Sequence, residues 1–215
     1  MASLVLLGDT SGSITVAAPA IAGSNTQTLP AVSGTVVVGS AAVSAAGQIP
    51  FSTNGTTYTP TAKIVSGTAV TLTNQTAPDF TGIPSWAKRI TVMFNGVSTN
   101  STGNPLIQLG DAGGYETTGY VATSTNQSGT VASYTSAFGI NNASAAAVLH
   151  GSVIISLLSA TTNTWAIQGS ICASALGGSY YVAGAKSLSE TLTSVRLFID
   201  GTQFFDAGTI NILYE

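Results

Sequence analysis

The stretch RITVMFNGV, residues 89–97, decides the fold class of this chain. It is short, rich in β-branched and bulky apolar residues, and it reaches Asn95-Gly96, a dipeptide typical of hairpin turns. The run SVRLFIDG, residues 194–201, has the same character and closes on Asp200-Gly201. Both runs predict β-strands that end in a turn at these dipeptides.

Other runs share the two-residue period of a strand, and a helical period of 3.6 is almost absent. We therefore predict an all-β fold from about residue 66 onward: an antiparallel, jelly-roll-like β-sandwich of about eight to ten strands. Bulky residues at adjacent positions in RITVMF and VRLFI predict strands covered on both faces, as in a sandwich packed into an oligomer. The other strand-like runs are AVTLTN (69–74), GSVIISLL (151–158), TWAIQGSI (164–171) and GTINILYE (208–215).

The first part of the chain has a different composition, with few large side chains and many Gly, Ser, Thr and Ala. We divide the chain into an extended assembly arm (1–50), a connector with a first strand (51–78) and a β-sandwich domain (79–215). Small side chains cannot close a core of their own, so the arm is expected to contact partner chains. The alternative is that it forms the first two strands of the sandwich. The apolar anchors of the arm would be Val16, Ile21, Leu29, Val36, Val37 and Val38.

Charge is scarce: only 6% of residues are charged, with 5 Lys+Arg and 8 Asp+Glu. Nucleic acid is an improbable partner because binding phosphates requires a cluster of basic residues. No run of about 20 apolar residues occurs, so membrane insertion is not expected. The start MASLVLLGDTSG lacks the features of a signal peptide, which predicts a protein made in the cytoplasm. Cys172, the single cysteine, lies among small apolar residues and is expected to be buried.

Three segments carry a resemblance to structural proteins of tailed bacteriophages. GDTSGSITVAAPAIAGSNTQTLPAVSGTVV (8–37) resembles a segment that recurs in tail-fibre-like virion proteins. FDAGTINILYE (205–215) is similar to the C-terminus of a group of small virion proteins, and IPSWAKRITVMFNGVST (83–99) resembles the opening strand of the same domain. The resemblance implies a virion location after assembly in the bacterial cytoplasm. It does not separate a tail fibre from a head decoration protein.

The residues offer little catalytic chemistry, and we predict that the chain is not an enzyme. His150 is the single histidine, and no G-x-S-x-G nucleophile motif is present. Asp111 and Glu116 lie in the glycine-rich stretch GDAGGYETTGY, where they could bind Ca²⁺ or sugar hydroxyls, or simply be solvated loop acids. No cofactor and no metal site are predicted.

Cations and tyrosines give the remaining candidates. Lys88, Arg89 and Arg196 lie in or beside apolar strands, which predicts salt bridges between strands or between subunits. Tyrosines in Gly/Ser/Thr-rich segments suit contacts with sugar rings or protein surfaces, although they could also pack the ends of the sandwich. These candidate receptor-loop residues are Tyr115, Tyr120, Tyr134, Tyr180 and Tyr181.

Two functions fit these observations. The first is a tail-fibre-like homotrimeric adhesin, in which the arm binds other virion proteins and the sandwich contacts a host surface glycan. The second is a head decoration, or cement, protein that stabilises the capsid. Both are non-enzymatic.

Overall fold

A computed structural model describes the backbone of residues 3–7, 13–17, 48–52 and 58–62, and both backbone and side chains of 64–215 except 143 and 200. The chain divides into two units, Met1–Val38 and Gly39–Glu215. In the first unit, β1 (Ser3–Leu7) and β2 (Ser13–Ala17) form an antiparallel hairpin in which Val16 lies opposite Leu4. In the second unit, β3 (Gln48–Ser52) pairs with β4 (Tyr58–Ala62). The anchors Ile21, Leu29 and Val36 to Val38 lie outside the described residues.

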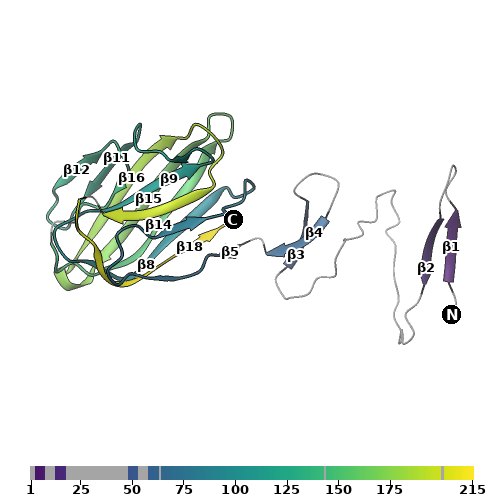
Figure 1. Ribbon diagram of the computed structural model, residues 1–215, viewed down its shortest axis with the longest axis horizontal. Coiled ribbons are helices and arrows are strands. Elements are labelled where there is room, and N and C mark those ends of the chain that lie inside the picture. The colour runs from purple at the N-terminus through teal and green to yellow at the C-terminus, as the bar shows by residue number, and fades with distance from the viewer. Residues whose placement is uncertain are drawn as a thin grey trace. The chain divides into compact units, whose positions relative to one another are not determined.

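The described part of the second unit contains an antiparallel β-sandwich, as predicted (Figure 1). Its larger sheet has nine strands in the order β12-β11-β16-β15-β14-β8-β18-β5, with β6 also paired to β18. The bounds of these strands are β12 (Val131–Tyr134), β11 (Val121–Thr125), β16 (Gly178–Ser187), β15 (Thr164–Ala173), β14 (Leu149–Ser159), β8 (Arg89–Thr99), β18 (Phe205–Tyr214), β5 (Val65–Ser66) and β6 (Val70–Thr71).

The smaller sheet has five strands in the order β10-β9-β17-β7, with β13 also paired to β9. The two sheets together hold more strands than predicted because five of the described strands are only two or three residues long. The sandwich also begins at β5, inside the segment predicted as connector and first strand. The bounds in the smaller sheet are β10 (Gly114–Tyr115), β9 (Pro105–Asp111), β17 (Ser194–Ile199), β7 (Asp79–Thr81) and β13 (Phe138–Gly139).

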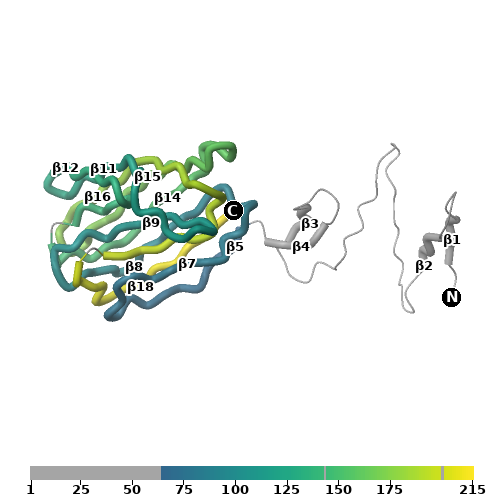
Figure 2. Tube along the Cα trace, turned by 45° about the horizontal axis from the view of Figure 1, so that its top comes forward, coloured from purple at the N-terminus to yellow at the C-terminus, as the bar shows by residue number. Residues whose placement is uncertain are grey.

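The strand pairs of the sandwich are nested in sequence: the outermost pair joins strands near the two ends of the domain, and each further pair lies between the strands of the one before. β8 pairs with β18, β9 with β17, β11 with β16, and β14 with β15. Figure 2 shows the first of these pairs, in which strands from opposite ends of the domain run side by side. Nested antiparallel pairs folded over one another are the organisation of a jelly roll. The one short helix in the described residues is a 3₁₀ turn at Ser174–Leu176. Among those residues, no helix has the length and apolar character needed to cross a bilayer.

The core lies between the sheets and follows the two-residue period of the strands. In β8, Ile90, Val92 and Phe94 are buried, whereas Thr91 and Met93 on the other face are half-buried. Within one chain RITVMF is therefore buried on one face only, and its predicted coverage on the other face by an oligomer stays a prediction. β9 is the strand buried at all seven positions.

Of the two predicted turns, the one at Asn95-Gly96 is wrong and the one at Asp200-Gly201 is confirmed at Gly201. β8 runs straight through Asn95-Gly96, and Gly96, with φ 69°, forms a bulge in the pairing with β14 instead of ending the strand. Gly201, with φ 78°, does lie in a turn after β17, and Asp200 is outside the described residues. This turn is not a hairpin, because β17 and β18 belong to different sheets.

Candidate functional site

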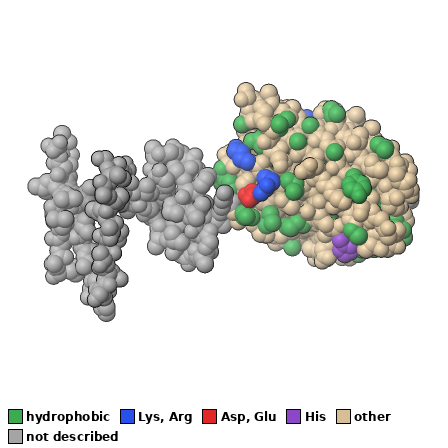
Figure 3. All heavy atoms as spheres, turned by 180° about the vertical axis from the view of Figure 1, so that it is seen from behind, with side chains coloured by type: hydrophobic (Ala, Val, Ile, Leu, Met, Phe, Trp, Pro, Cys, Tyr) green, Lys and Arg blue, Asp and Glu red, His purple; other side chains and the backbone are tan. Residues whose placement is uncertain are grey.

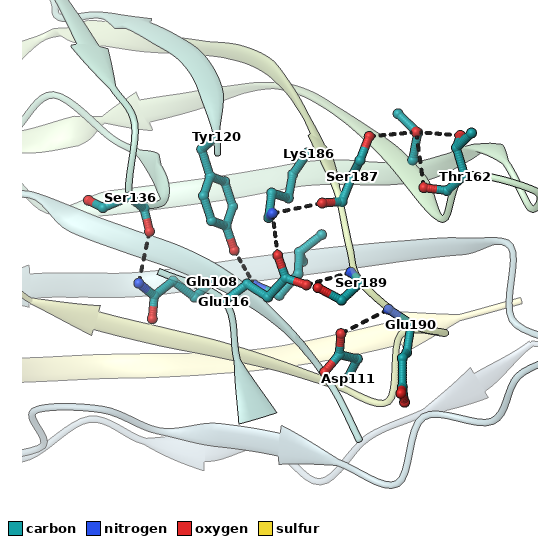
Figure 4. Close-up of polar contacts among 12 residues, drawn as sticks. Gln108, Asp111, Glu116, Tyr120, Ser136, Thr162, Lys186, Ser187, Ser189 and Glu190 are labelled. Carbon is teal, nitrogen blue, oxygen red and sulfur yellow. Dashed lines mark hydrogen bonds and ion pairs between the residues drawn. The ribbon is translucent and has the colours of Figure 1, made fainter. Parts of the chain in front are cut away.

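Two carboxylates bind the segment that follows β16 (Figure 4). One is Asp111, the last residue of β9, and the other is Glu116 in the glycine-rich segment after it. Glu116 forms an ion pair with Lys186, and its Oε1 accepts a hydrogen bond of 2.5 Å from the backbone N–H of Ser189. Asp111 accepts from the N–H of Gly113 at 2.9 Å and from that of Glu190 at 3.1 Å. Asp111 is buried and Glu116 is half-buried, and both bind the protein's own backbone instead of forming a pair around an open site.

The environment of Glu116 stabilises its charged form. Partial burial by itself raises the pKa of this carboxyl, but hydrogen bonds from Lys186 and Ser189 outweigh it and lower the pKa to about 2. Lys186 is only 5% exposed, donates a second hydrogen bond of 2.7 Å to the carbonyl oxygen of Ser187, and lies 5.4 Å from the ring centroid of Tyr120. A buried ammonium group with a carboxylate, a carbonyl and a π face around it is a structural ion pair.

The five candidate tyrosines have three different environments. Tyr120 and Tyr180 are fully buried, and the hydroxyl oxygen of Tyr120 accepts a hydrogen bond of 2.8 Å from the N–H of Leu109. Burial raises the pKa of both phenols. These two are core residues, so their prediction as receptor-loop residues is wrong. Tyr134 packs against the core from the end of β12.

Tyr115 takes part in a stack on the outer face of the smaller sheet. The guanidinium of Arg196 lies 4.4 Å from the ring centroid of Tyr115 and 5.0 Å from that of Phe198. Arg196 also donates to Oε1 of Gln108 through Nε and Nη2, at 2.9 and 2.5 Å. Burial raises the pKa of Tyr115, and the nearby Asp79 carboxylate adds to that effect. The result is a half-buried surface on which a cation is held between two aromatic rings.

The other predicted cations differ from one another. Arg89 forms the predicted inter-strand salt bridge, with Glu215. Lys88 instead donates to the backbone oxygen of Ser85 at 3.3 Å. Arg196 forms no salt bridge with another described residue, because Gln108 takes the place of the expected acid.

His150 and Cys172 lie opposite each other on β14 and β15. Nδ1 of His150 accepts a hydrogen bond of 3.2 Å from the N–H of Gly96, so the histidine supports the bulge in β8. Cys172 is exposed, contrary to prediction, because its small apolar neighbours in sequence alternate between the two faces of the strand.

A small cavity of about 90 Å³ lies beside Lys88, with Asn163, Trp165 and Thr191 among its lining residues. The indole Nε1 of Trp165 is buried without a hydrogen-bond partner. A cavity of this size has room for a few water molecules and not for a sugar ring. No group of three or more potential metal ligands occurs among the residues that the structure describes.

Of three strongly exposed apolar side chains, Tyr181 was predicted from the sequence as a receptor-loop residue, whereas Val121 and Val131 were not singled out. Val121 is 76% exposed, while Val131 and Tyr181 are each 61% exposed, on the neighbouring strands β11, β12 and β16. Alternation within VATST and VASY could have indicated that one face of these strands is uncharged, but not that it is open to solvent.

In comparisons with known proteins, the chain matches no family model, no curated protein and no solved structure.

Proposed function

We propose that this chain is a non-enzymatic structural protein of a tailed-bacteriophage virion, a homotrimeric adhesin that contacts a glycan on the host surface. The observation that carries the proposal is how the domain uses its few charged groups. Glu116 pairs with Lys186 and accepts a hydrogen bond from the backbone of Ser189, and Asp111 accepts one from the backbone of Glu190. These contacts stabilise the sandwich. Rigid β-scaffolds of this kind suit attachment and assembly, and the sequence resemblance to virion proteins supports the same class.

The receptor contact is assigned to the outer face of the smaller sheet. Tyr115 and Phe198 present aromatic rings, and the guanidinium of Arg196 between them uses two of its N–H groups on Gln108. Aromatic faces bind the C–H faces of sugar rings, and the remaining guanidinium donors suit sugar hydroxyls or carboxylates. Of the five candidate tyrosines, Tyr115 best fits this role.

The N-terminal arm is proposed to bind other virion proteins, which leaves the sandwich free to project. The particle itself tests this proposal. Gold-labelled antibody against residues 64–215 should mark the tail of intact virions in electron micrographs. Label spread over the head would instead support a decoration protein that stabilises the capsid. Particles that carry no label at all would refute both functions.

The glycan contact needs its own experiment. On an array of bacterial surface glycans, the full chain should bind a subset, and Tyr115→Ala should bind at least about tenfold more weakly because the stacking face is lost. Tyr115→Phe is the matched control, since it keeps the ring and should bind like the unchanged protein. Equal binding by the Ala and Phe variants, with both folded by circular dichroism, would place the receptor contact elsewhere.

A further inference from the structure

The outer face of the larger sheet is a broad surface almost without charge. None of the chain's 13 charged residues, the sum of 5 Lys+Arg and 8 Asp+Glu, lies in β11, β12, β14 or β15. β16 contains one, Lys186, and its side chain is buried on the inner side. Figure 3 shows one face of the molecule, where most blue and red atoms lie near one edge, a small blue patch lies at the top, one histidine is purple, and most other atoms are tan or green.

Pairing registers define which side chains share this outer face. They run across the strands in three rows, and we call these residues the uncharged face. The first row is Val131, Thr125, Tyr181, Ser170, Ser152, Met93 and Asn211. The second row is Ser133, Thr123, Ala183, Gln168, Ile154, Thr91 and Leu213. The third row is Val121, Ala185, Ala166 and Ser156, and it ends at Arg89, which is paired with Glu215.

The composition of the uncharged face differs from that of a free protein surface. The first two rows contain no charged residue, in a chain of which only 6% of the residues are charged, against about a quarter in an average soluble protein. Val121, Val131 and Tyr181 are strongly exposed at one corner of this face. Depletion of charge together with an exposed Tyr is shared with interface cores, although the Ser and Ala residues of these rows are not typical of them.

The size of this face also fits an interface. The three central strands have 11, 10 and 10 residues. At about 3.3 Å per residue and about 4.8 Å between strands, they cover about 500 Å². Adding β8, β11 and β12 brings the area to about 800 Å², which is the area that each partner contributes to a standard stable interface.

We infer that the uncharged face packs against copies of the same chain. A face without charges has nothing to select a charged partner, and the faces of three copies can meet around a threefold axis without like-charge repulsion. Small side chains at its centre, such as Ala183 and Ala166, let two sheets approach to the usual distance of about 10 Å. The inference rests on the self-association in the proposed function and identifies its surface. It also assigns Tyr181 to assembly rather than to receptor binding.

The test is the mass of the full chain by light scattering after size exclusion. Ala183→Glu and Thr123→Glu each place a charge in the second row of the face, and either should raise the dissociation constant of the oligomer at least about a hundredfold. Thr81→Glu, an exposed position on β7 of the other sheet, is the matched control and should leave the mass unchanged. Circular dichroism should show all three variants folded.

The outcomes separate the two proposals. An oligomer that dissociates in both face variants but not in Thr81→Glu supports the inference. If the oligomer of the unchanged chain then has a mass other than that of a trimer, only the proposed symmetry is corrected. An oligomer that persists in both face variants overturns the inference and leaves the proposed trimer standing. An unchanged chain that stays monomeric at high concentration overturns both.

Discussion

The ammonium group of Lys186 in β16 pairs with the carboxylate of Glu116, which follows β10 in the other sheet. This ion pair, together with the bond from Ser189 to Glu116, connects the two layers of the sandwich at one end. Lys186 and Glu116 are two of the few charged residues in the domain, and each compensates the charge of the other.

Removing the acid should be costly. In Glu116→Gln the buried Lys186 loses its counter-charge, and we expect the free energy of unfolding to fall by about 2–3 kcal/mol. Lys186→Met in the same chain removes the stranded charge, so the double variant should recover part of the loss. Urea unfolding followed by fluorescence measures both. A single variant within about 0.5 kcal/mol of the unchanged protein would show that the pair contributes nothing.

The same carboxylate predicts how stability depends on pH. Folding lowers the pKa of Glu116 from 4.5 to about 2, so its contribution is fully present above about pH 5 and is lost as pH falls towards 2. The contribution is at most about 3 kcal/mol. Urea unfolding at pH 7, 4, 3 and 2.5 should show this decline. Glu116→Gln should lack that component of the decline, and parallel curves for the two proteins would argue against the lowered pKa.

Two glycines that face each other in β8 and β18 should respond differently to alanine. A Cβ on Gly208, with φ 97°, would lie 2.4 Å from the backbone oxygen of Gly96, so Gly208→Ala should destabilise by at least about 2 kcal/mol. A Cβ on Gly96, with φ 69°, meets no atom closer than 3.9 Å, so Gly96→Ala should cost only the strain of the left-handed conformation, about 1 kcal/mol. Thermal unfolding ranks the two, and the reverse order would contradict the bulge geometry.

Cys172 provides a native reporter of the uncharged face. It is exposed on β15, beside the first row, and is the only thiol in the sequence. Burial between copies should slow its reaction with a thiol reagent about tenfold relative to the dispersed Ala183→Glu variant. Equal rates in an oligomer and in the dispersed variant would place Cys172 outside the contact.

The period of two in the sequence was sufficient to predict the sandwich, because alternation reports which side chains face a core. It could not predict what Asn95-Gly96 does. A glycine with positive φ serves a turn or a bulge equally well, and only the distant partner strand β14 decides between them. The burial of Tyr120 and Tyr180 was also beyond local sequence, since their neighbours are small polar residues typical of loops. Similarly, Lys186 lies in the loop-like string GAKSLS, and its ion pair depends on a residue far away in the chain.

Nested pairing has a consequence for how the domain reaches its native state. β14 ends at Ser159 and β15 begins at Thr164, so this innermost pair closes a very short loop. β8 ends at Thr99 and β18 begins at Phe205, so pairing of these two outermost strands closes a loop that contains most of the domain. Since the entropic cost of closure grows with loop length, folding is expected to start at the β14–β15 hairpin and to proceed outward, at the slow rates of proteins with high contact order.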